Sequence, residues 1–391
     1  MDLRIVKLYL FNFLRNIHLF GSISIPFFLD WAHLNYTKIF LLEAWFMLWI
    51  FLLEIPTGII SDKYGRKLSL IIGSIFGGAS LLLFGLINDY YTFFVAEFLG
   101  AVAVALFSGA DKALFYDTLI ELKKKREARY YLSRYEAFGT AGIFAGLPVG
   151  SLIAGSSLLP YPQTLPLTFI ITALFVLLTL IVVLTIKEPK KKALEENFIR
   201  AGLNGFNYIF RHKKLRAFSL NTVLIAIATF FMFWFYQPLS GEAGISITYF
   251  GFIGAGYNLF GILLMSNVKK IEKFFNINTI LLFSALIPGF FLIGVAFVRN
   301  VFFVLLAIFL ITGLRLFRRP VLEDFMNQHI TSQNRATVLS GISMIERAGI
   351  LILYPIVGFL ADLSLTYVLV FLGIITLIFS FVTKLEANHF A

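Results

Sequence analysis

Cysteine is absent from the 391-residue sequence, which excludes disulfides and thiolate metal sites and leaves the redox compartment undetermined. Charged residues are also scarce, at 14% of the chain, against about 25% in a soluble domain. The sequence has no phosphate-binding loop, no pair of metal-ligand histidines and no Gly-x-Ser-x-Gly. These absences argue against a soluble enzyme and against an ATP-driven pump, and they predict no cofactor and no metal ion.

Apolar residues, in contrast, make up 59% of the chain, and its mean hydropathy is +0.85. Apolar runs of about 20 residues recur, and each is long enough to cross ~30 Å of hydrocarbon as a helix. The sequence therefore predicts an all-α integral membrane protein with twelve transmembrane helices. The expected spans are 6–29, 38–60, 68–87, 92–119, 133–155, 167–186, 217–236, 248–268, 279–298, 301–325, 337–361 and 367–383.

The net charge of +11 can indicate a nucleic-acid partner, but the basic residues gather in alternate loops. Lys and Arg number three in 63–67, six in 123–134, nine in 187–216 and three in 269–273. This alternation is typical of the positive-inside rule; it predicts cytoplasmic termini and contact with anionic lipid, and no nucleic acid. Residues 1–7 lead into the first apolar run without a cleavage site, so we expect an uncleaved first span.

The longest polar stretch, 187–216, divides the chain into an N-terminal six-helix bundle at 1–186 and a C-terminal one at 217–391. Apolar residues recur within this stretch at helical spacing, which predicts a basic amphipathic helix on the inner leaflet. A solvated linker is the alternative. The residues are Phe198, Ile199, Leu203, Phe206, Ile209 and Phe210.

An internal repeat supports two pseudo-symmetric halves. A shift of 207 residues aligns helices four and five with helices ten and eleven without a gap. It places Leu132 on Leu339, Gly142 on Gly349, Pro148 on Pro355, Asp117 on Asp324, and Asp111 and Lys112 on Arg318 and Arg319.

The segment Glu54–Lys67 separates the second and third spans. Gly58 and Gly65 are expected to allow a tight turn and a close approach, and Asp62 to cap the next helix or to lie against another helix's N-terminus. The basic residues of the segment mark a cytoplasmic turn. The order Gly58, Ile60, Asp62, Gly65, Arg66, Lys67, Leu70 resembles the signature of the major facilitator superfamily between its second and third helices.

This resemblance implies a monomeric secondary transporter, not an enzyme, whose two six-helix halves rock about a midplane site for a small molecule. It also implies a prokaryotic inner membrane. The second half does not preserve the signature, because Lys269 falls on Asp62 and Lys273 on Arg66.

The fifth predicted span carries glycines and a proline at short spacing. They resemble the Gly-x-x-x-Gly-Pro motif of drug–proton antiporters, with the difference that Leu147 separates the last Gly from Pro. The motif implies a hinge that favours export, and ordinary small-residue packing is the alternative. The antiporter arginine of helix four is missing, and Glu97 lies where it is expected. The motif residues are Gly142, Gly146, Pro148 and Gly150.

Charges deep in the predicted spans are functional candidates, because a charge at the bilayer centre costs roughly 2.5–3.5 kcal/mol. Arg15 lies about 14 Å into the first span at ~1.5 Å per residue, and Glu346 lies at a similar depth in the eleventh. The candidates for substrate binding are Asn12, Arg15, Asn16, Arg315 and Arg347. The candidates for proton coupling are Glu346 first, then Glu97, Asp111 and His18. A structural ion pair of Glu346 with an arginine, and a packed neutral imidazole at His18, are the alternatives.

Charges near the inner ends of the fourth and tenth spans predict a cytoplasmic gate of ion pairs between the halves, with snorkelling to the headgroups as the alternative. The gate residues are Glu54, Asp111, Lys112, Asp117, Arg318, Arg319, Glu323 and Asp324. Asp30 and Glu43 are expected in solvent near the outer surface.

The helix-five motif and the compact length favour proton-coupled efflux of a small organic solute or drug. Because three central arginines outnumber one central glutamate, a carrier of organic anions or phosphorylated metabolites is the alternative. A membrane sensor or scaffold that transports nothing is a third interpretation, against which the lack of an extra soluble domain counts. Substrate, coupling ion and direction do not follow from the sequence.

Overall fold

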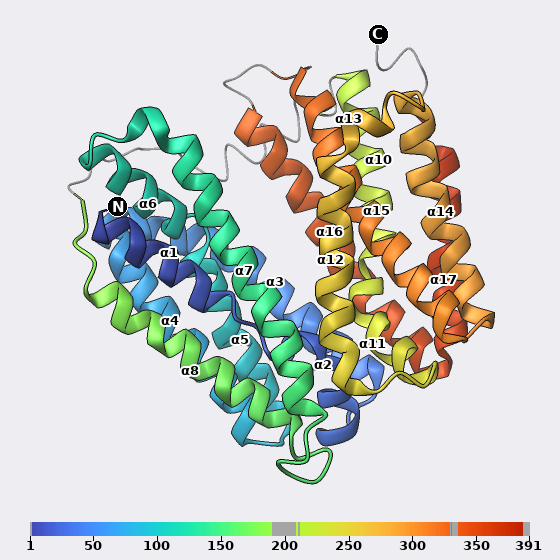
Figure 1. Ribbon diagram of the computed structural model, residues 1–391, viewed down its shortest axis with the longest axis horizontal. Coiled ribbons are helices and arrows are strands. Elements are labelled where there is room, and N and C mark those ends of the chain that lie inside the picture. Colours follow the sequence, from blue (N-terminus) through green and yellow to red (C-terminus); the bar gives the residue numbers. More distant parts are fainter. Residues whose placement is uncertain (1, 190–208, 210–211, 329, 331–334, 386–391) are drawn as a thin grey trace. The chain divides into compact units, whose positions relative to one another are not determined.

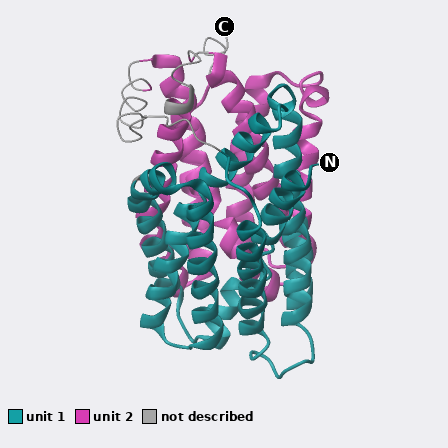
Figure 2. Cartoon of the chain, turned by 90° about the vertical axis from the view of Figure 1, so that its left-hand side faces the viewer, with its two compact units in different colours: residues 1–195, 246–255 teal, residues 196–245, 256–391 magenta. Residues whose placement is uncertain are grey.

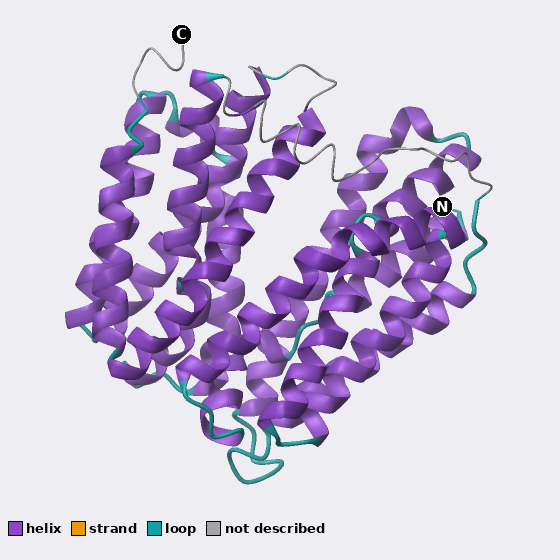
Figure 3. Ribbon diagram, turned by 180° about the vertical axis from the view of Figure 1, so that it is seen from behind, coloured by secondary structure: helices purple, strands orange, loops and turns teal. Residues whose placement is uncertain are grey.

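The computed structural model describes residues 2–189, 209, 212–328, 330 and 335–385 (Figure 1). Within these ranges the chain forms helices joined by short connections and contains no strand, so the all-α prediction is confirmed (Figure 3). The predicted amphipathic helix lies, apart from Ile209, outside the described residues.

The chain divides into two compact units, which are described separately (Figure 2). Unit 1 comprises residues 1–195 with 246–255, and unit 2 comprises 196–245 with 256–391. The short segment 246–255 belongs to unit 1 because it packs on helix α7, where the Ser151 hydroxyl donates to the carbonyl of Thr248 at 2.9 Å.

The helices of unit 1 follow the chain from its N-terminus. They are α1 (Leu3–Arg15), η1 (Phe20–Ser22), α2 (Ser24–Pro26), η2 (Phe27–Trp31), α3 (Tyr36–Tyr64), α4 (Arg66–Leu86), α5 (Tyr90–Phe107), α6 (Ala110–Glu121), η3 (Lys125–Glu127), α7 (Ala128–Ala154), α8 (Leu165–Leu184) and η4 (Ile247–Tyr249).

Unit 2 contains seven further helices of the described chain, and α12 begins in unit 1 and continues into unit 2. They are α10 (Lys213–Phe230), α11 (Met232–Glu242), α12 (Phe250–Ser266), α13 (Val268–Ile271), α14 (Ile277–Phe297), α15 (Val301–Gln328), α16 (Arg335–Leu363) and α17 (Leu365–Val382), where α12 is the shared one.

In the described part of the chain, eleven segments are long and apolar enough to cross a membrane, one fewer than the twelve predicted. The difference lies in the first predicted span, 6–29, which is not one helix. Helix α1 ends at Arg15, and the chain continues through a 3₁₀ turn, one α turn and a π turn. The fourth predicted span, 92–119, is also broken, since α5 ends at Phe107 and α6 begins at Ala110.

Helix α4 packs closely against α5 and α8 in unit 1. Small residues allow this close packing: a Cβ added at Gly78 would lie 2.4 Å from Leu177, and the hydroxyls of Ser74 and Thr179 are 2.8 Å apart. Glycine and serine at such contacts let membrane helices approach closely where lipid offers no hydrophobic driving force.

Helix α10 packs against α15, α16 and α17 in unit 2. Its buried face carries Asn221, whose amide donates to the carbonyl and hydroxyl of Thr383 at 2.9 and 3.0 Å. This contact holds the C-terminal end of α17 on α10, and it also positions the Asn221 oxygen for the arginine described below.

Candidate functional site

Arg15 is the last residue of α1, where the negative end of the helix dipole favours a cation. Its guanidinium carbon lies 5.5 Å from the ring centre of Phe11 and 5.2 Å from that of Phe107. These rings cover the guanidinium, and 21% of the side chain stays exposed. Contacts with the protein alone therefore hold the Arg15 guanidinium in place.

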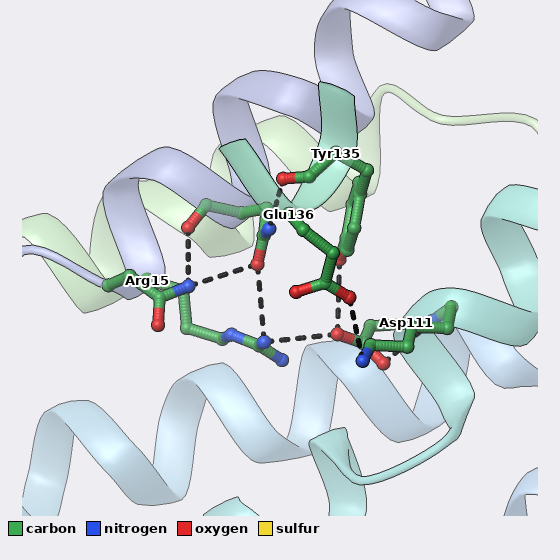
Figure 4. Close-up of polar contacts among 7 residues, drawn as sticks. Arg15, Asp111, Tyr135 and Glu136 are labelled. Atoms are coloured by element: carbon green, nitrogen blue, oxygen red, sulfur yellow. Dashed lines mark hydrogen bonds and ion pairs between the residues drawn. The ribbon is translucent and has the colours of Figure 1, made fainter. Parts of the chain in front are cut away.

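The partner of Arg15 is Asp111, which is 3% exposed (Figure 4). One Arg15 nitrogen lies 3.0 Å from the Asp111 carboxylate and donates to the Asn12 side-chain oxygen at 3.2 Å. The Tyr135 hydroxyl donates to the same carboxylate oxygen at 3.1 Å. Three helices, α1, α6 and α7, thus meet at one buried carboxylate in unit 1.

Asparagines connect this network to the backbone. The Asn12 amide donates to the carbonyl of Tyr135 at 2.7 Å, and the Asn16 amide donates to the Asn12 side-chain oxygen at 2.9 Å. The predicted residues Asn12, Arg15, Asn16 and Asp111 therefore lie in one cluster.

The break between α5 and α6 puts Asp111 in the first turn of α6. Gly109 has φ +76°, a conformation that glycine adopts without strain. The carboxylate of Asp111 accepts the backbone N–H of Lys112 at 2.6 Å, at the helix end where the dipole favours an anion. The Ser-Gly dipeptide at 108–109 is a turn signal that the prediction of one continuous span overlooked.

The glycines of α7 form the contact with the interrupted first span. A Cβ at Gly142 would lie 2.4 Å from the carbonyl oxygen of Phe13, one at Gly146 2.7 Å from the backbone nitrogen of His18, and one at Gly150 1.8 Å from the carbonyl oxygen of Leu19. The structure thus shows close packing of backbone on backbone, and α7 remains helical through Pro148. The hinge role stays a prediction.

The basic turn of unit 1 is shorter than predicted. Helix α3 continues through Asp62 and Lys63, so Gly65, with φ +109°, is the whole connection to α4. Asp62 does not cap α4. Nor does Gly58 allow a close approach, because nothing lies within 4 Å of the position of its Cβ.

Glu188, beyond the end of α8, caps α4 instead. Its carboxylate accepts the backbone N–H of Arg66 at 2.6 Å, and a Cβ at Gly65 would lie 2.7 Å from it. The Arg66 side chain forms an ion pair with Asp117 of α6. Sequence reasoning missed Glu188, because nothing in its local pattern shows that the chain returns to this turn.

A cavity of about 280 Å³ lies within unit 2. Charged and polar side chains at its wall are Thr222, Thr229, Arg315, Arg318, Arg319 and Glu346. Arg315, a candidate for substrate binding, and Glu346, the first candidate for proton coupling, both line this cavity, whereas Arg347 is not among the described residues that line it.

Glu346 is 7% exposed, and its carboxylate lies 3.4 Å from an Arg319 nitrogen. Arg319, in contrast, is 48% exposed and has other partners: Glu323 at 2.9 Å and the Ser343 hydroxyl at 3.0 Å. Glu346 is thus in an ion pair with an arginine, which is the structural alternative expected from the sequence. Arg319 itself has other partners and does not need Glu346 to balance its charge.

Arg315 is the least satisfied cation at the cavity. Its guanidinium carbon lies 5.3 Å from the ring centre of Phe230, and its Nε is buried without a hydrogen-bond partner in the described part of the chain. Arg315 lines the cavity, but this N–H is enclosed by protein atoms, so an acceptor in the cavity reaches it only if the side chain moves.

Arg318 is 4% exposed and binds neutral acceptors only among the described residues. It donates to the Ser284 hydroxyl at 2.6 Å, to the carbonyl oxygen of Leu281 and to the side-chain oxygen of Asn221. Its three bonds link α15 to α14 and α10, which indicates a structural role in unit 2.

The predicted gate residues other than Glu54 have described partners within their own units. In unit 1 Asp111 binds Arg15, Lys112 binds Glu136 at 2.7 Å, and Asp117 binds Arg66. In unit 2 the Gln328 amide reaches Asp324 at 3.5 Å. Ion pairs between the halves stay a prediction.

His18 packs edge-on against Phe20, with ring centres 5.6 Å apart, as a packed imidazole would. Sequence reasoning missed Tyr135, although Tyr135, Gly139, Gly142 and Gly146 share one helix face at spacings of four, three and four. Within the described ranges, no three His, Cys, Asp or Glu side chains converge in a way that could hold a metal ion.

Comparison with known sequences gives one family. Residues 8–317 match the model of the Major Facilitator Superfamily. Multidrug resistance protein 1 of Bacillus subtilis (strain 168) is 26% identical over 206 residues, which are 52% of this chain. The matched stretch spans 49% of that relative, about half of its length.

Solved structures share the fold over nearly the whole chain. The nucleoside transporter NupG superposes with a TM-score of 0.82 at 14% identity, covering 98% of both chains. A bacterial homologue of the human lysosomal transporter Spinster gives 0.75 at 15% identity, covering 99% of this chain and 95% of that one. A D-xylose–proton symporter gives 0.73 at 13% identity, covering 97% and 96%.

Proposed function

The chain belongs to the Major Facilitator Superfamily and is a membrane transporter, and on that premise we propose that it is a secondary transporter that exports a small organic solute or drug in exchange for protons. In this proposal its two six-helix halves, 1–186 and 217–391, expose a midplane site alternately to the two sides. The sequence match to a multidrug resistance protein supports the export of organic solutes.

The observation that carries proton coupling is the position of Glu346 in the cavity of unit 2. Glu346 is the one carboxylate among the described residues that line this cavity, and a buried carboxylate in a cleft is a candidate for a functional role. When Glu346 is neutralised, Arg319 keeps Glu323 as its ionic partner. Protonation of Glu346 also removes the negative charge that acts on Arg315, which keeps its contact with the Phe230 ring.

Transport by reconstituted protein tests this function. Purified protein is placed in proteoliposomes with an acidic lumen, and uptake of ethidium, a fluorescent organic cation, is measured with a pH dye in the lumen. We expect uptake above equilibrium, together with loss of luminal protons. Empty liposomes and a protonophore serve as controls. Uptake that is equal with and without the pH gradient would contradict proton coupling.

Arg315 favours a second candidate, a carrier of organic anions or phosphorylated metabolites. Its buried Nε lacks a partner among the described residues, and together with Arg318 and Arg319 it makes the cavity wall more basic than acidic. Thermal-shift measurements with benzoate and a sugar phosphate, compared with ethidium, distinguish the two. Stabilisation by the anions that is lost in Arg315→Gln would favour this candidate.

We also propose that the protein acts as a monomer in an inner membrane. Both termini and the segment 187–216 lie in the cytoplasm in this proposal, because the basic residues gather in the loops of that side. A phosphatase reporter fused at Asn204 should be inactive and one at Gln163, in the opposite loop, active. The reverse pattern would overturn this topology.

A further inference from the structure

Two glutamates lie at the same depth on neighbouring helices of unit 1. Glu43 is seven residues beyond Tyr36, the start of α3, and Glu97 is seven residues beyond Tyr90, the start of α5. At ~1.5 Å per residue, each lies about 10 Å inside its helix. Glu97 is 7% exposed and Glu43 is half-buried, which corrects the expectation that Glu43 lies in solvent.

The packing of α3 on α5 places these two residues on the same contact face. The ring of Phe46 lies 3.5 Å from the Cβ position of Gly100. Glu43 precedes Phe46 by three residues and Glu97 precedes Gly100 by three, so both lie one turn back on the same contact face. The Glu43 carboxylate accordingly acts electrostatically on Glu97.

No cation neutralises this pair among the described residues, since neither carboxylate takes part in an ion pair or hydrogen bond there. Helix α4, which packs against both α3 and α5, has no titratable residue between Leu68 and Leu86. The nearest charge on α3 is Lys38, whose ammonium lies 5.4 Å from the ring centre of Tyr90.

The other charged groups near these helices have partners elsewhere. Asp30, on η2, accepts the hydroxyl of Tyr161. Asp111 and Asp117 of α6 bind Arg15 and Arg66.

The immediate surroundings of the pair are aromatic. The Trp45 indole donates to the carbonyl of Phe94 at 3.1 Å, and Trp49 packs edge-on against Phe98, with ring centres 4.7 Å apart. The Trp49 N–H is buried without a partner in the described chain. Glu97 is nearly inaccessible and has no described counter-charge, a place in which burial favours the neutral form of a carboxylate.

We propose that Glu43 and Glu97 form a proton-binding site in unit 1, in which the two carboxylates share one proton. A carboxylate oxygen forms an O–H bond with a proton taken from water, and the remaining negative charge is shared by the pair. Two like charges at one site oppose double ionisation, so the site releases its proton at a higher pH than either glutamate alone. The site is separate from Glu346 in unit 2 and does not depend on which solute the chain carries.

Infrared spectroscopy of the full chain in lipid nanodiscs tests the site without any transport. The carbonyl stretch of protonated carboxyl groups is followed as a function of pH in wild-type protein, Glu43→Gln, Glu97→Gln and the double variant. Glu127→Gln, at an exposed position of η3, is the matched control. Because glutamine mimics the neutral carboxyl, we expect all variants to fold, and a melting curve checks this.

The wild type should show a carboxyl band at neutral pH that the double variant lacks and the control keeps. Each single variant should keep a band, but this band should disappear at a pH about one unit lower than in the wild type, which is a tenfold lower hydroxide concentration. The reason is that the remaining glutamate has lost a like-charged neighbour. Equal spectra in wild type and the double variant would overturn the site. A midpoint that moves when sodium replaces choline would also overturn it, in favour of a metal cation as the ligand. A failure here would leave the uptake test of transport unaffected.

Discussion

Asp111 and Arg318 occupy equivalent positions in the internal repeat, 207 residues apart, yet they carry opposite charges. Both are nearly inaccessible, at 3% and 4% exposure. Unit 1 neutralises its buried charge with an opposite one, Arg15, at 3.0 Å. Unit 2 surrounds Arg318 with neutral oxygens of Asn221, Leu281 and Ser284. The same place in the repeat is thus filled by two different kinds of polar network.

The next residues of the repeat show that the geometry is kept while the chemistry changes. Lys112 binds Glu136 at 2.7 Å in unit 1, and their equivalents Arg319 and Ser343 bind each other at 3.0 Å in unit 2. A neutral hydroxyl replaces the acid, so Arg319 is left with capacity to bind Glu323 and Glu346. The loss of one acid in the repeat therefore makes Arg319 available to the candidate coupling residue.

The largest effect in this comparison is expected from Arg318→Met. The variant removes three donated hydrogen bonds and leaves the Asn221 and Ser284 oxygens buried without a donor. We expect a loss of about 3–4 kcal/mol in the free energy of unfolding. Denaturation of the purified protein by sodium dodecyl sulfate measures it. Lys269→Met, at an exposed position of α13, is the control, with an expected loss below about 1 kcal/mol. Equal losses in the two variants would refute the structural role of Arg318.

Gly142 and Gly349 are a second pair of equivalent positions in the repeat, and their neighbours differ. A Cβ at Gly142 would lie 2.4 Å from the backbone carbonyl of Phe13, whereas one at the equivalent Gly349 would lie 2.3 Å from the end of the Ile227 side chain. A side chain can rotate away, but a backbone must shift. Gly142→Ala should therefore cost about 2–3 kcal/mol and Gly349→Ala below about 1 kcal/mol. If Gly349→Ala is the more damaging in the same assay, the packing argument for α7 is wrong.

The sequence predicts the long spans well because their apolar length alone determines them. The expected helices at 167–186 and 279–298 are observed as α8 (Leu165–Leu184) and α14 (Ile277–Phe297). Asn12, Arg15 and Asp111 were each candidates, and the structure brings them into one cluster. Depth did not predict this contact, because Arg15 was expected deep in the first span and Asp111 near the inner end of the fourth.

The breaks in the first and fourth spans could not be predicted from apolar length, because the runs continue across them. The break after Arg15 is stabilised by contact with the glycines of α7, and this is a tertiary effect. The pairing of Glu43 with Glu97 depends likewise on how α3 faces α5, which spacing within either helix does not determine.

An intermediate loss of stability is expected from Asp111→Asn, which removes the ion pair with Arg15 in unit 1. The asparagine oxygen can still accept the Tyr135 hydroxyl, so only the charge that binds Arg15 is lost. Arg15 retains the Asn12 oxygen and some solvent, and we expect a cost of about 1–2 kcal/mol. A double-mutant cycle with Arg15→Gln should show a coupling of about 1 kcal/mol. Additive losses would mean that the ion pair contributes nothing to unit 1.

The smallest change in stability, and the most informative about transport, is expected from Glu346→Gln. Arg319 keeps Glu323 and Ser343, and Arg315, on which Glu346 also acts, keeps the face of the Phe230 ring. The free energy of unfolding should therefore fall by about 1 kcal/mol, less than the roughly 3–5 kcal/mol that follows when a buried cation loses its sole partner. If Glu346 carries the coupling proton, glutamine fixes it in a neutral form: solute exchange across proteoliposomes should persist, whereas uptake driven by a pH gradient should vanish. Glu323→Gln, which removes the exposed partner of Arg319, is the matched control and should retain pH-driven uptake. A stable Glu346→Gln protein with full pH-driven uptake would exclude Glu346 from coupling and leave the Glu43–Glu97 pair of unit 1 as the site to test.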